Sequence, residues 1–99
     1  MTDLTVEQQL DALTTRLLPP LRAAKHLETQ ALDELCTLLE QQRESGFFAD
    51  MIPVRLAGKF WFVFWAMLAE AEHTSAPDPI LDAAWRYQEE LRLSFGPTY

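Results

Sequence analysis

The sequence predicts an all-α protein that folds as a compact four-helix domain without a sheet. Apolar residues recur at the three- and four-residue spacing of amphipathic helices along most of the chain. Glycine is rare, at 3 of 99 residues, and no alternating apolar run is bounded by hairpin residues. Hydrophobic residues make up 48% of the chain and charged residues 23%, as in globular proteins. We therefore expect a single helical domain over residues 1–99.

The first predicted helix covers residues 5–18. Thr5 is a suitable N-cap residue, and Gln8 follows at the position that a capping box requires. The helix then carries one apolar stripe, formed by Val6, Leu10, Leu13 and Leu17. Because the Pro19–Pro20 pair lacks backbone donors, we expect it to end or sharply kink this helix.

The second predicted helix covers residues 20–44. Its apolar stripe consists of Leu21, Ala24, Leu27, Ala31, Leu35 and Leu38, widened by Leu32 and Leu39. The start stays open, because Thr29 is an alternative N-cap that would leave residues 19–28 irregular. Gly46 is suited to the position after the helix end, where a left-handed backbone is common. Cys36 lies among the leucines, so we expect a buried thiol with a raised pKa rather than a nucleophile.

The third and fourth predicted helices cover residues 53–72 and 79–94, separated by a loop at residues 74–79. Pro53 is tolerated in the first turn of the third helix. Asp78 is expected to cap the fourth helix, with Pro79 at its first position. Apolar residues then follow at helical spacing: Ile80, Ala84, Tyr87, Leu91 and Phe95.

The run Phe60–Ala69 contains ten consecutive apolar residues, five of them aromatic. As a helix it spans about 15 Å, half of a bilayer core, so we expect no membrane span. The middle of this helix is apolar on every side, which is typical of a helix that is buried all round. A helical wheel assigns one arc to the chain's own core, consisting of Phe60, Trp61, Phe64, Trp65 and Leu68.

The opposite arc of the third helix predicts an interface with a second copy of the chain. It is formed by Arg55, Gly58, Lys59, Phe62, Ala66, Ala69, Glu70 and His73. Small residues permit close approach of helices, and the basic and acidic ends oppose the helix dipole. An antiparallel pair around a two-fold axis near Phe64 would bring Lys59 to the partner's Glu70 and Phe62 to the partner's Ala66. Two alternatives stay open: the arc is covered by helix one or the FFADMI segment at residues 47–52, or it binds another protein or a ligand.

No catalytic or cofactor signature is present in the sequence. Glu70 and His73 are one helical turn apart, but the second such pair that a di-iron bundle needs is missing, so we expect no metal site and no cofactor. An aromatic-lined ligand pocket is the alternative kind of site. Its predicted residues are Phe47, Phe48, Trp61, Trp65, Trp85 and Tyr87.

The net charge is −7, from fifteen acidic and eight basic residues. This charge disfavours nucleic acid as a partner and favours a basic protein. A single cysteine and an N-terminus without a signal-peptide pattern predict a cytoplasmic protein. We expect a non-enzymatic interaction module, such as a small regulator, adaptor, chaperone or immunity-type inhibitor, that acts as a homodimer through helix three. The alternative is a helical sensor of a small hydrophobic ligand.

Overall fold

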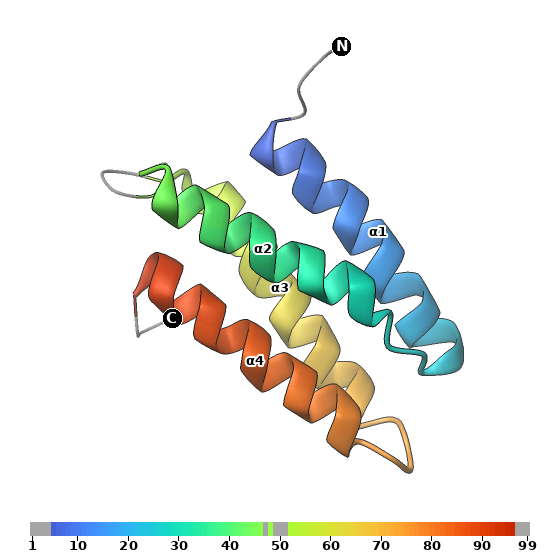
Figure 1. Ribbon diagram of the computed structural model, residues 1–99. Helices are drawn as coiled ribbons and strands as arrows, with labels where there is room; N and C mark the ends of the chain where they lie inside the picture. The colour runs from blue at the N-terminus through green and yellow to red at the C-terminus, as the bar shows by residue number, and fades with distance from the viewer. Residues whose placement is uncertain (1–4, 47, 49–51, 97–99) are drawn as a thin grey trace.

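The computed structural model describes residues 5–46, 48 and 52–96, and these residues form four α-helices and no strand (Figure 1). This confirms the predicted all-α four-helix fold. The helices are α1 (Val6–Ala24), α2 (Thr29–Glu44), α3 (Val54–Ala71) and α4 (Asp78–Phe95). In the described part of the chain, none of them combines the length and apolar composition needed to cross a membrane.

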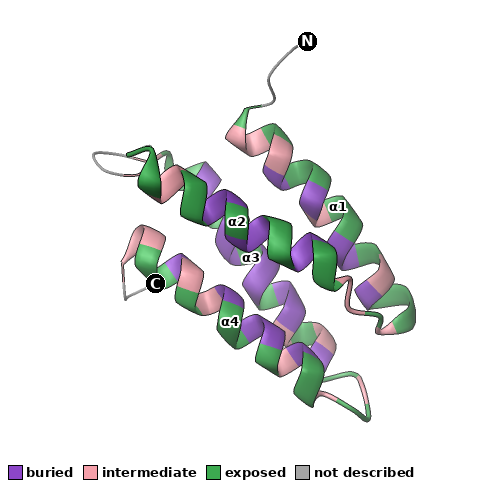
Figure 2. Ribbon diagram, viewed as in Figure 1, coloured by how far each residue is buried: buried purple, intermediate pink, exposed green. Residues whose placement is uncertain are grey.

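The helices alternate in direction along the chain. Helices α1 and α4 each pack against both α2 and α3. In Figure 1, α3 lies behind α2 and between α1 and α4. Buried residues lie on the sides of the helices that face one another, and exposed residues lie on the outer sides (Figure 2). Each helix therefore has an inner side in the core and at least one outer side.

Helix α1 begins as predicted and ends later than predicted. The Thr5 hydroxyl accepts a hydrogen bond of 3.1 Å from the Gln8 backbone N–H, and the Gln8 side chain accepts one of 2.9 Å from the Thr5 N–H. The predicted end at residue 18 is wrong, since the helix continues through Pro19 and Pro20 to Ala24. Buried leucines lie on both sides of the prolines, and their burial favours a continued helix over a break. They are Leu17, Leu18 and Leu21.

Helix α2 begins at Thr29, so the predicted start at residue 20 is wrong and the later alternative is nearer. That alternative left residues 19–28 irregular, whereas residues 19–24 belong to α1. Its N-cap residue is Glu28 rather than Thr29. The predicted state of Cys36 is confirmed: the side chain is buried, and burial raises the pKa of its thiol to about 11. Gly46 follows the helix with φ +80°, the left-handed backbone predicted for it.

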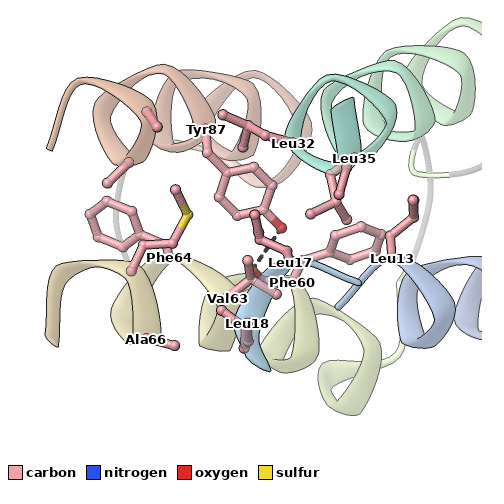
Figure 3. Close-up of a cluster of buried hydrophobic side chains, with 14 of the residues drawn as sticks. Leu13, Leu17, Leu18, Leu32, Leu35, Phe60, Val63, Phe64, Ala66 and Tyr87 are labelled. Atoms are coloured by element: carbon pink, nitrogen blue, oxygen red, sulfur yellow. Dashed lines mark hydrogen bonds between the residues drawn. The ribbon is translucent and has the colours of Figure 1, made fainter. Parts of the chain in front are cut away.

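Helices α3 and α4 lie within one residue of their predicted bounds. Asp78 does not cap α4 but is its first residue, because Pro77 takes the N-cap position and Pro79 comes second. Helix α4 provides the largest fully buried side chain, that of Tyr87. Figure 3 shows this ring among leucines of α1 and α2 and aromatic residues of α3. The described core therefore draws side chains from all four helices.

Candidate functional site

One side of α3 is covered by ion pairs with α1. Arg55 and Lys59 both contact the carboxylate of Glu7, at 2.7 and 2.9 Å, and Lys59 also contacts Asp11 at 2.6 Å. The hydrogen bond from Lys59 lowers the pKa of Glu7, and the hydrogen bond to Asp11 raises the pKa of Lys59. Helix α1 thus supplies the acidic partners that we expected from a second chain.

The acidic end of α3 is also paired within the chain. The Lys25 ammonium lies 2.5 Å from the Glu70 carboxylate, and this hydrogen bond lowers the pKa of Glu70. Lys25 follows α1 with φ 51°, in the left-handed region. The predicted contact of Lys59 with the partner's Glu70 therefore loses its basis, because both charges have intramolecular partners.

Ala66 lies within 40° of Lys59 and Glu70 around the helical wheel of α3, on the same side of the helix, and is only 8% exposed. This part of the predicted interface is therefore covered within the chain, as one of the two alternatives proposed.

Among the described residues, no group of three or more His, Cys, Asp or Glu side chains could hold a metal ion. Glu70 is occupied by Lys25, and His73 is exposed beyond the end of the helix.

A different side of α3 is exposed. We call it the outer stripe, and its members are Val54, Gly58, Phe62, Trp65 and Ala69. Phe62 is 53% exposed and Trp65 is 57% exposed, although both are large apolar side chains. The prediction that Trp65 belongs to the core is wrong, because α1 and α4 flank α3 and leave the side between them open. Phe60, Trp61 and Phe64 are buried as predicted.

A pocket of about 290 Å³ opens beside the outer stripe at the N-terminal half of α3. The described residues that line it are all apolar: Ile52, Val54, Ala57, Gly58, Trp61 and Trp65. A Cβ atom added at Gly58 would meet no atom within 4 Å, so packing inside the chain does not require glycine there. Glycine in a helix interior is nevertheless about 0.5–1 kcal/mol less stable than alanine. The absence of a side chain at this position leaves the pocket open.

The pocket contains two of the six aromatic residues predicted for it, Trp61 and Trp65. Phe48 packs on Phe60 and Phe95 instead, with ring centroids 6.3 and 5.0 Å apart. Tyr87 is buried in the core, and Phe47 lies outside the described residues.

Trp85 is the sixth predicted pocket residue, and it extends the exposed apolar surface onto α4. Its ring lies 5.9 Å from that of Phe64, and the Phe64 ring in turn lies 5.2 Å from that of Trp65. Sequence reasoning missed the small and aliphatic part of the pocket, formed by Ile52, Val54, Ala57 and Gly58. The glycine inside an otherwise apolar helix was the one signal that pointed to it.

Charge is unevenly distributed over the four helices of the described chain. Helix α2 carries four acidic residues and one basic residue, and α4 carries four acidic and two basic residues. Helix α1 is balanced, with two of each, whereas α3 carries two basic residues and one acidic residue. The outer stripe therefore lies on the least negative helix of an acidic protein.

No family model, no curated protein and no solved structure matches this chain. The outer stripe of α3 and the pocket beside it are therefore the features that bear on function.

Proposed function

We propose that this chain is a non-enzymatic protein-interaction module that forms a homodimer through the outer stripe of α3. The observation that carries the proposal is the exposure of Phe62 and Trp65 on one apolar helix face, beside an open apolar pocket. Exposed apolar patches of this kind mark interaction surfaces, and aromatic residues are enriched at the centres of such surfaces.

The distribution of charge supports a second copy as the occupant. Two identical acidic chains repel each other, and this repulsion is smallest where their least negative surfaces meet. Contact along α3 places the acidic helix α2 of each chain on the side away from the interface, since α2 lies in front of α3 (Figure 1). The dimer then presents its acidic surfaces to solvent, where they favour a basic protein as a further partner.

Sedimentation equilibrium of single variants tests the homodimer. We expect Trp65→Arg to be monomeric, because it places a charge in the centre of the apolar contact. Leu93→Arg is the matched control, since Leu93 on α4 is 59% exposed, outside the stripe, and should remain dimeric. Ala66→Arg is unsuitable, because Ala66 is buried and the substitution would disturb the fold. Equal association of both variants would contradict the proposal.

The pocket supports a second candidate function, namely binding of a small hydrophobic ligand. Its apolar lining and volume of about 290 Å³ are consistent with an aromatic or aliphatic molecule. An anilinonaphthalene sulfonate probe distinguishes the two candidates. Saturable binding to a monomeric wild type, with a raised melting temperature that Gly58→Leu abolishes, would favour the ligand sensor over the dimer.

A further inference from the structure

We infer that two chains pair antiparallel around an axis next to Phe62, so that Trp65 of each chain enters the pocket over Gly58 of the other. This inference rests on the proposed homodimer and adds its register and its central contact. The occupant is a second copy of this chain. The order of large and small residues along the outer stripe and the open pocket at Gly58 lead to this arrangement.

Large and small residues follow one another along the outer stripe in such an order that two antiparallel copies place large residues opposite small ones. The midpoint of Val54 and Ala69 is also the midpoint of Gly58 and Trp65, and it lies next to Phe62. In an antiparallel pair around that midpoint, Val54 faces the partner's Ala69 and Gly58 faces the partner's Trp65. A large side chain therefore meets a small one at every position except the axis, where two Phe62 rings come together. A two-fold interface requires this self-complementarity.

The pocket provides the space that this register needs. Gly58 lines it, an added Cβ atom there would meet no atom within 4 Å, and the other described lining residues are apolar. Trp65 is more than half exposed, so it has apolar surface left to bury. The partner's Trp65 would bury that surface against Gly58, Trp61 and Val54, and the two pockets of the dimer would be filled symmetrically.

Charge does not oppose the pairing. The cations Arg55 and Lys59 lie on the α1 side of α3, where Glu7 and Asp11 neutralise them. The stripe residues themselves are uncharged. Two copies can therefore approach along this face without placing an unpaired charge in the contact.

Disulfide trapping tests the register. Phe62→Cys lies next to the axis and should form a disulfide-linked dimer on mild oxidation. Two Gly58→Cys chains should not, because their Cα atoms would be about 10 Å apart along the helix, beyond the roughly 7 Å limit for a disulfide. A mixture of Val54→Cys and Ala69→Cys chains should cross-link, whereas each variant alone should not. Wild type is the control, since its Cys36 is buried.

The outcomes separate the register from the dimer itself. Cross-linking of Val54→Cys with itself together with Gly58→Cys with itself would show parallel pairing, and self-cross-linking of only one of these two variants would show a shifted axis. Either result overturns the inference while the homodimer stands. A wild type that sediments as a monomer removes the proposed function as well.

A change of pocket size tests the central contact. Gly58→Leu fills the pocket and should raise the dimer dissociation constant at least tenfold, while the melting temperature of the monomer is maintained or raised. Gly58→Ala, which adds one methyl group, should have a smaller effect. Combining Gly58→Leu with Trp65→Ala should restore part of the lost association, because the new side chain occupies the space that the indole leaves. Unchanged dimerisation of Gly58→Leu, with the fold intact, would overturn the contact.

Discussion

The hydroxyl of Tyr87 on α4 donates a hydrogen bond of 2.9 Å to the backbone carbonyl of Phe60 on α3, in the buried centre of the molecule (Figure 3). Burial raises the pKa of Tyr87, so the phenol stays protonated and remains a donor. The contact holds α4 against the inner side of α3. It lies on the side of α3 opposite the outer stripe, which faces solvent.

Replacing Tyr87 with phenylalanine tests this hydrogen bond without removing the ring. We expect a loss of about 1 kcal/mol in the free energy of unfolding, which is typical of a buried hydrogen bond. For a domain of this size the melting temperature should fall by about 4–8 °C. Thermal unfolding followed by circular dichroism measures the change. An unchanged melting temperature would show that the hydroxyl contributes nothing to holding α4 on α3.

The left-handed backbone at Lys25 predicts that glycine is more stable than alanine at this position. With φ 51°, a side chain here costs about 1 kcal/mol that glycine does not incur. Lys25→Gly and Lys25→Ala both lose the ion pair with Glu70, so the difference between them isolates the backbone term. We expect the glycine variant to be the more stable of the two by about 1 kcal/mol in urea unfolding. Equal stability would show that the backbone at residue 25 is not left-handed in solution.

The ion pairs between α1 and α3 predict a loss of stability in acid. The pKa values of Glu7 and Glu70 are lowered below the ordinary value of 4.5 in the folded protein. Their contribution is therefore complete above pH 4.5 and is lost as the pH falls through the lower folded values. A combined Glu7→Gln and Glu70→Gln variant should lose less stability than wild type between neutral and acid pH. Urea unfolding at several pH values tests this, with the exposed Glu44→Gln as the control.

The prolines inside α1 predict a stabilising substitution. Pro19 is exposed and lies within the helix, where it cannot donate to the carbonyl four residues earlier. Pro19→Ala restores that donor, and a helix interior favours alanine over proline by up to about 3 kcal/mol. We expect a clear rise in the urea midpoint. A lower midpoint would mean that Pro19 contributes more to the packing of α1 than its missing donor costs.

Much of the fold could be predicted from residue spacing, because burial on one helix side leaves a periodic pattern. The capping box at Thr5, the left-handed turn at Gly46 and the buried thiol of Cys36 are local features, and all three were predicted correctly. The continuation of α1 through Pro19 was not predicted, because it depends on the packing of leucines on both sides of the prolines against other helices. Local proline geometry alone cannot reveal that tertiary contribution.

The candidate site could be predicted only in part. The apolar run of α3 identified the correct helix, and Gly58, Phe62 and Ala69 are exposed on it. A wheel does not show which neighbour covers which side, so Trp65 and Ala66 were assigned to the wrong sides. The charges of α3 were expected to pair across an interface, whereas α1 lies close enough to pair them within the chain.

The most direct test of the central claim is the mass of the wild-type protein by sedimentation equilibrium at micromolar concentration. We expect a species of twice the chain mass of 11.4 kDa. A single species of 11.4 kDa across that range would contradict it.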